Sequence, residues 1–148
     1  MEIAFKYAEM LKAKNMVYHY NNKKIENTGV EDRENVLLKE NEYIEECKNA
    51  ENLALIDIGH SNANSWYLEN VIKNLKDKIM SYHLHTNDGA KDEHKSMFEE
   101  NKSPRIPEFI ELYKKYTPKA YLVVEYSNYY EDKEDRVIEY IKKLNFLL

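Results

Sequence analysis

The segment Leu53–His60 reads LALIDIGH, and its short apolar run ending in a carboxylate is the strongest structural signal in the sequence. Four consecutive apolar residues are typical of a covered strand, because a strand buried on both faces shows no polar alternation. Asp57 stands directly after that run, and His60 follows three positions later. The segment therefore predicts a strand over residues 53–58 with chemically active side chains at its carboxyl end.

Helix and strand patterns alternate on both sides of this segment. Apolar residues recur with helical spacing, which predicts helices within residues 3–12, 33–48, 68–75, 106–113 and 137–144. Pro107 suits the first turn of the fourth of these helices. Short apolar runs predict further strands at residues 16–19, 24–27, 79–85 and 121–125. Strands that alternate with helices favour an α/β fold with a parallel sheet, and we expect helices to cover both of its faces.

Length and composition limit the class of protein. The chain has 148 residues, of which 43% are hydrophobic and 33% charged, so we expect one domain spanning residues 1–148. No apolar run approaches the ~20 residues of a membrane span, and no secretory signal is visible at the N-terminus. The single cysteine, Cys47, cannot form an internal disulfide. These features favour a reduced, cytoplasmic protein that does not bind membranes.

The charge balance argues against a large nucleic-acid interface. Lys and Arg number 22 against 27 Asp and Glu, which gives a net charge of −5. Nucleic-acid binding usually relies on a surplus of basic side chains that neutralise phosphates. The 13 tyrosines could form base-stacking platforms, but a general bias in composition explains them better. We therefore expect a small-molecule ligand.

Imidazoles and carboxylates occur at the end of every predicted strand. In α/β sheets and barrels the carboxyl ends of the strands meet at one edge, where ligands bind. This combination suits Zn, Mn, Co or Fe better than Ca. The period of two places His83 and His85 on one face, and we interpret His83 as structural and His85 as functional. The residues at or just after the strand ends are His19, Glu26, Asp57, His60, His83, His85, Asp88, Asp92, His94 and Glu125.

Several of these motifs resemble those of the xylose isomerase-like TIM barrel superfamily. That superfamily includes sugar phosphate isomerases and epimerases and the AP-endonuclease type of DNA-repair enzyme. The stretch IDIGH at 56–60 resembles its D-x-x-H motif, and HTND at 85–88 followed by DEH at 92–94 resembles its H-x-N-D and D-x-H segment. Its E-N-T strand end, its final glutamate strand and an earlier histidine strand resemble residues 25–28, 123–125 and 17–19.

The resemblance implies a TIM barrel with a divalent metal ion (Zn, Mn, Mg or Co) at its carboxyl-terminal mouth. The implied metal ligands are Glu26, Asp57, His85 and Glu125. In the isomerase branch Glu26 and Glu125 also form the acid–base pair. The implied substrate-binding residues are His60, His19, Asp92 and His94, which in the endonuclease branch would bind further zinc ions.

The chain is shorter than a complete barrel of this kind. A TIM barrel typically needs about 250 residues, and only five residues separate His19 from Ile25, where a parallel crossover needs a dozen or more. We therefore expect a partial or truncated (β/α) barrel that lacks its N-terminal strands, with a homo-oligomer as one way to complete it. Three functions stay open: a metal-dependent isomerase or epimerase acting on a sugar or sugar phosphate, a zinc-dependent AP endonuclease, and a non-catalytic remnant or assembly partner.

Overall fold

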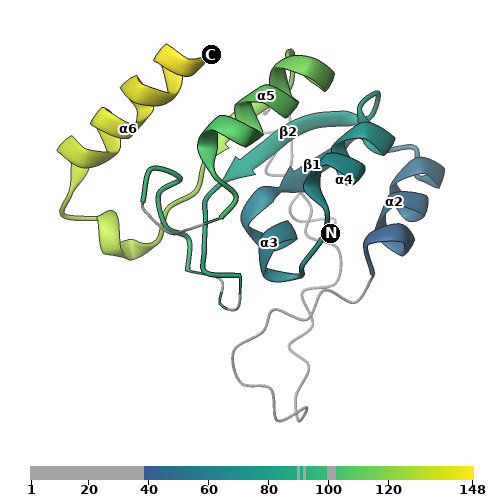
Figure 1. Cartoon of the computed structure of the whole chain (residues 1–148), viewed down its shortest axis with the longest axis horizontal. Helices are drawn as coiled ribbons and strands as arrows, with labels where there is room; N and C mark the ends of the chain where they lie inside the picture. The colour runs from purple at the N-terminus through teal and green to yellow at the C-terminus, as the bar shows by residue number, and fades with distance from the viewer. Residues whose placement is uncertain (1–38, 90, 92, 100–102) are drawn as a thin grey trace, which may run out of the picture.

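The structure, a computed structural model, describes residues 39–89, 91, 93–99 and 103–148 (Figure 1). Its elements are α2 (Glu40–Asn49), β1 (Ala54–Asp57), α3 (Ile58–Ala63), α4 (Leu68–Leu75), β2 (Ile79–Leu84), α5 (Ile106–Tyr116), β3 (Tyr121–Val124), η1 (Asn128–Tyr130) and α6 (Glu134–Leu147). The helix expected within 3–12 and the strands expected at 16–19 and 24–27 lie outside the described residues.

Three parallel strands form the sheet, in the order β1-β2-β3. Asp57 on β1 stands opposite His83 on β2, and His83 stands opposite Val123 on β3. The described part of the chain confirms the α/β class and the parallel strands. These three strands make an open sheet, and no barrel is formed within the described residues.

The apolar core lies between one face of the sheet and helices α4 and α5, which lie side by side in Figure 1. Val71 and Ile72 of α4 are fully buried, as the helical spacing predicts. Tyr82 of β2 meets Phe109 of α5 edge to face, with ring centroids 5.1 Å apart. Pro107 occupies the first turn of α5, as expected, because the missing amide hydrogen is not needed there.

At β3 the face of the sheet turned away from α5 is exposed, although the same face is buried at Ser81 and His83 of β2. Tyr121 and Val123 alternate with the residues of β3 that face the helices, and their exposed fractions are 62% and 44%. Within the described residues no helix covers Tyr121 and Val123, so the expectation of two covered faces does not hold at β3, which lies at the edge of the described sheet. Ile58, expected at the end of the first described strand, instead begins α3.

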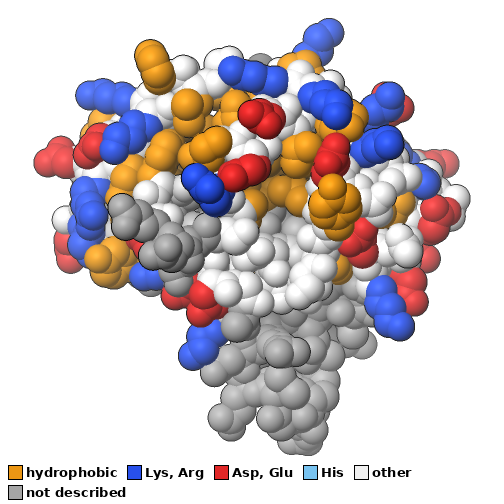
Figure 2. All heavy atoms as spheres, in the orientation of Figure 1, with side chains coloured by type: hydrophobic (Ala, Val, Ile, Leu, Met, Phe, Trp, Pro, Cys, Tyr) orange, Lys and Arg blue, Asp and Glu red, His pale blue; other side chains and the backbone are white. Residues whose placement is uncertain are grey.

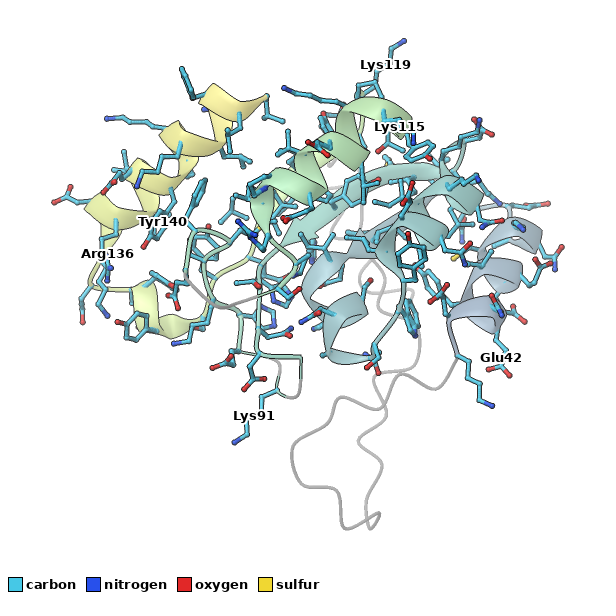
Figure 3. All side chains as sticks on the ribbon, viewed as in Figure 1. Glu42, Lys91, Lys115, Lys119, Arg136 and Tyr140 are labelled. Carbon is cyan, nitrogen blue, oxygen red and sulfur yellow. The ribbon has the colours of Figure 1, made fainter. Side chains whose placement is uncertain are left out.

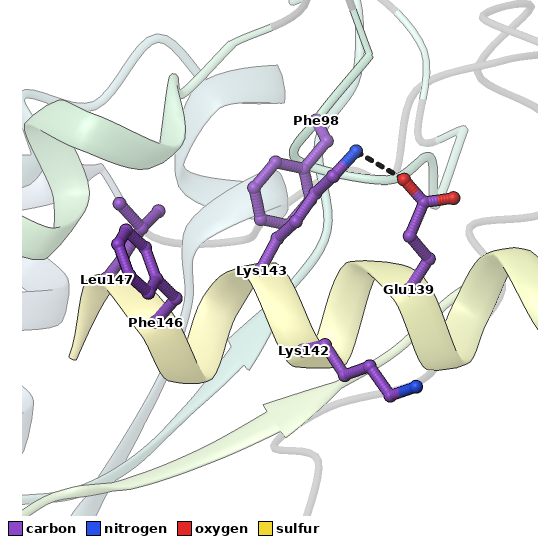
Figure 4. Close-up of a pocket in the computed structure, with 6 residues that line it drawn as sticks. All are labelled: Phe98, Glu139, Lys142, Lys143, Phe146 and Leu147. Atoms are coloured by element: carbon purple, nitrogen blue, oxygen red, sulfur yellow. Dashed lines mark ion pairs between the residues drawn. The ribbon is translucent and has the colours of Figure 1, made fainter.

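Helix α6 packs against the loop between β2 and α5. Tyr140 points from α6 toward that loop, where its ring stacks on Phe98 at a centroid distance of 5.5 Å (Figure 3). Apolar side chains gather over the part of the surface formed by α5 and α6 in Figure 2. A groove of about 370 Å³ runs along α6 beside a 2.6 Å ion pair between Lys143 and Glu139 (Figure 4). No helix in the described ranges combines the length and apolar character that a bilayer crossing needs.

Phe109 is the side chain whose removal should harm the fold most. It is fully buried against Tyr82, so Phe109→Ala leaves a cavity and loses apolar burial. We expect the free energy of unfolding, measured by urea denaturation, to fall by about 3–5 kcal/mol. Phe146 is 90% exposed, and Phe146→Ala should change the same quantity by less than about 0.5 kcal/mol. Equal effects of the two substitutions would contradict this account of the core.

Candidate metal centre

Six ligand-type side chains meet at the carboxyl edge of the described sheet. Parallel strands bring their carboxyl ends to one edge, so residues far apart in the sequence become neighbours there. Asp57 ends β1, His83 and His85 lie at the end of β2, and Glu125 follows β3. Helix α3 contributes one further imidazole, and the loop between β2 and α5 contributes another. The six residues are Asp57, His60, His83, His85, His94 and Glu125.

The first group consists of Asp57, His83 and Glu125. Their ligand atoms all lie within 4.8 Å of one another. His83 Nδ1 is 2.5 Å from Glu125 Oε2 and 3.6 Å from Asp57 Oδ2. The sequence interpreted His83 as structural; the structure places its ring in contact with both carboxylates, which makes it a candidate ligand.

The second group consists of His60, His85 and His94, whose ligand atoms also lie within 4.8 Å of one another. The rings of His85 and His94 stack at a centroid distance of 3.9 Å. His85 Nε2 lies 2.8 Å from Asp57 Oδ1, so Asp57 joins the two groups. Asp57, His85 and Glu125, three of the four metal ligands implied by the resemblance, therefore belong to one cluster.

Asp57 also has a local structural role. Its Oδ1 accepts a hydrogen bond of 2.9 Å from the backbone N–H of His60 and thereby caps the N-terminus of α3. The cap accounts for one carboxylate oxygen only. Asp57 Oδ2 and Glu125 Oε2 are buried and accept no well-formed hydrogen bond in the described structure. A divalent cation bound between these two carboxylate oxygens and the neighbouring imidazole nitrogens would satisfy them.

The electrostatics of the cluster are set by these close contacts. Burial acts to raise the pKa of Asp57, but the imidazoles of His83, His85 and His60 outweigh it and hold that pKa well below 3.8. The carboxylate of Asp57 raises the pKa of His83, burial opposes this, and the charge of Glu125 adds to the rise, so the pKa lies above 6.5. Without a metal, the cluster therefore favours an ionised Asp57 beside a protonated His83.

These shifts predict how the stability of the chelator-treated protein depends on pH. A raised folded-state pKa means that His83 adds stability below about pH 6.5, and this contribution is lost as the pH rises through the folded value. The lowered pKa of Asp57 adds stability above about pH 3.8, which is lost only in stronger acid. We therefore expect the melting temperature in chelator to fall as the pH rises above about 6.5. His83→Gln should remove that fall, and an equal fall in both proteins would contradict the assignment.

His94 reaches the cluster through an unusual backbone conformation. Its φ angle is +46°, a left-handed value that is uncommon for a residue other than glycine. Its backbone C=O accepts a 3.0 Å hydrogen bond from the N–H of Ser127, and its Nδ1 lies 3.3 Å from the backbone oxygen of Glu125. The segment after β3 thus holds this imidazole over the strand ends.

The remaining expected site residues are not placed. His19, Glu26 and Asp92 lie outside the described residues. His60 and His94, which the resemblance implies as substrate-binding residues, lie in the second group beside His85. His83 is the member that sequence reasoning set aside, and the period of two along residues 83–85 was the signal that could have included it. Comparison with protein-family models, with curated proteins and with solved structures found no match to this chain.

Proposed function

We propose that this protein is a metal-dependent isomerase or epimerase that moves a proton next to the carbonyl of a sugar or sugar phosphate. The observation that supports it is the convergence of two carboxylates and four imidazoles on one edge of a parallel sheet. The mixed nitrogen and oxygen donors suit Zn, Mn or Co, and suit Mg less well because Mg prefers oxygen ligands. The proposal includes a partial TIM-type barrel, with Glu26 as a further ligand and a second copy as a way to complete the sheet.

The exposed fractions of the side chains suggest different roles for them in metal binding, proton transfer and substrate binding. The side chain of Asp57 is 11% exposed, which suits a ligand at the floor of the centre. The side chain of Glu125 is 38% exposed, so it is open to a substrate and can take up the proton. His60, at 23% exposure, can hold a substrate oxygen. A divalent ion bound there would polarise the carbonyl oxygen as a Lewis acid and so ease removal of the neighbouring proton.

Metal binding and turnover can be tested on the full chain. Protein freed of metal by chelation is titrated with Zn²⁺, Mn²⁺ and Co²⁺ by calorimetry, and it is then incubated with a panel of ketoses, aldoses and their phosphates. We expect saturable binding of at least one ion, and interconversion of a substrate that stops when chelator is added. Absence of binding by all three ions would end the proposal. Binding without any turnover would favour a non-catalytic remnant.

A second candidate is a zinc phosphodiesterase that acts on abasic DNA. The observation that favours it is the second group, because three clustered imidazoles could hold zinc beyond the ion at Asp57. The net charge of −5 counts against it, since phosphate-backbone binding needs local positive charge. Nicking of an abasic duplex by the zinc-loaded protein, with an undamaged duplex as control, would select this function over the isomerase.

A further inference from the structure

We propose that Gly59 and Asn87 are positioning residues for the metal centre, because together they fix the place of the His85 imidazole. The inference rests on the proposed metal-binding function and concerns how one ligand of that centre is oriented. Neither residue belongs to the six candidate ligands. Gly59 lies in α3, and Asn87 lies in the segment that follows β2.

Gly59 leaves the space that the His85 ring occupies. His85 is completely buried, and a Cβ added to Gly59 would lie 2.7 Å from His85 Nε2 and still closer to Cε1 and Nδ1. Real Cβ atoms essentially never show contacts under 3.0 Å, so the ring and any larger residue cannot both keep these positions. Glycine disfavours a helix by about 1 kcal/mol relative to alanine. Helix stability therefore does not explain a glycine at this position of α3, whereas the space that the His85 ring occupies does.

Asn87 holds the backbone of α3 beside that ring. It is fully buried, and its Nδ2 donates a 2.7 Å hydrogen bond to the backbone oxygen of Gly59. Its Oδ1 accepts hydrogen bonds from Asn62 Nδ2 at 2.7 Å and from the N–H of Gly89 at 2.9 Å. Both ends of the amide are thus fixed, and the segment two residues beyond His85 is tied to α3.

The position of the ring matters for the two groups of ligands. His85 Nε2 lies 2.8 Å from Asp57 Oδ1, and the same ring stacks on His94. A ring pushed away from Gly59 would change both relations, and with them the direction of the nitrogen lone pair toward a bound ion. Loss of an outer partner that orients a metal ligand typically lowers metal affinity by about 10- to 100-fold.

Three variants of the full chain separate positioning from general stability. Gly59→Ala places a methyl group against the ring. Asn87→Asp keeps an acceptor for Asn62 but puts an oxygen in place of the Nδ2 donor that faces Gly59. Thr117→Val is the control, since it removes a buried 2.7 Å hydrogen bond with Tyr82 at the end of α5, away from the strand ends.

Cobalt is the probe, because its visible absorption bands report ligand geometry. Each protein is titrated with Co²⁺ alone, and its melting temperature is measured without metal. We expect Gly59→Ala and Asn87→Asp to bind Co²⁺ about 10- to 100-fold more weakly, with altered bands. We expect Thr117→Val to melt earlier but to keep the wild-type affinity and spectrum. Wild-type bands and affinity in both site variants, or equal losses in the control, would overturn the proposal.

One further variant and one further measurement cover the cases in which Gly59→Ala does not fold or the wild-type protein binds no Co²⁺. If Gly59→Ala does not fold, Asn87→Asp and Asn62→Ala test the proposal in its place. Asn62→Ala is the milder change, since it removes only one hydrogen-bond donor to Asn87. If wild-type protein binds no Co²⁺, the metal-binding proposal fails, and the imidazole NMR signals of His85 in metal-free protein decide this inference separately. A change of those signals in the site variants but not in Thr117→Val supports positioning, and unchanged signals overturn it.

Discussion

Asp57→Asn should reduce the affinity for a divalent ion by more than about 100-fold, beyond the loss typical of an outer-shell partner. Asp57 lies in contact with both ligand groups: its Oδ1 is 2.8 Å from His85 Nε2, and its Oδ2 is 3.6 Å from His83 Nδ1. The substitution removes the negative charge that attracts the ion. It retains an Oδ1 that can accept the hydrogen bond from the N–H of His60 and so cap α3. We therefore expect loss of binding in a folded protein.

The measurement is calorimetric titration of chelator-treated protein, with circular dichroism to check the fold. Asp77→Asn makes the same chemical change at an exposed position just before β2, at the opposite end of the sheet. It should leave the affinity unchanged. Asp57→Ala should add a loss of about 1 kcal/mol in the free energy of unfolding, because the cap of α3 disappears. Wild-type metal affinity in Asp57→Asn would exclude this carboxylate as a ligand.

Glu125→Gln should lower the rate constant of proton transfer by about 100- to 10,000-fold, the usual range for loss of a general base. Glu125 is the more exposed of the two carboxylates in the centre, and its Oε2 lies 2.5 Å from His83 Nδ1. Glutamine has the same shape but cannot accept a proton at neutral pH. The measurement is the exchange of substrate hydrogen for deuterium in heavy water, with whichever sugar or sugar phosphate the substrate panel identifies.

The comparison of rate and affinity separates two roles of Glu125. The rate is measured at saturating metal, so weaker metal binding alone is compensated by concentration. Glu111→Gln, on the exposed side of α5, is the matched control and should exchange hydrogen at the wild-type rate. Full exchange activity in Glu125→Gln at saturating metal would show that another group takes the proton.

The sequence alone determined the order of the three strands and of α2, α4, α5 and α6, but not α3 or η1, and it indicated most of the candidate ligands. Local periodicity was enough for α4, α5 and α6, because an amphipathic helix records its buried face in its own spacing. Asp57 and Glu125 could be recognised because each directly follows an apolar run, and parallel strands bring such ends together. These inferences depend only on neighbours along the chain and on one rule of topology.

The tertiary structure alone decided the grouping of the ligands and the role of Gly59. His83 belongs between two carboxylates because the register sets it opposite Asp57, and register depends on pairing between strands. Gly59 matters because a ring from β2 packs onto its backbone. Local spacing carries no record of such contacts, since the two partners are brought together only when the strands and α3 pack. The sequence therefore indicated that the candidate ligands lie at the strand ends, and packing determined which of their atoms come into contact.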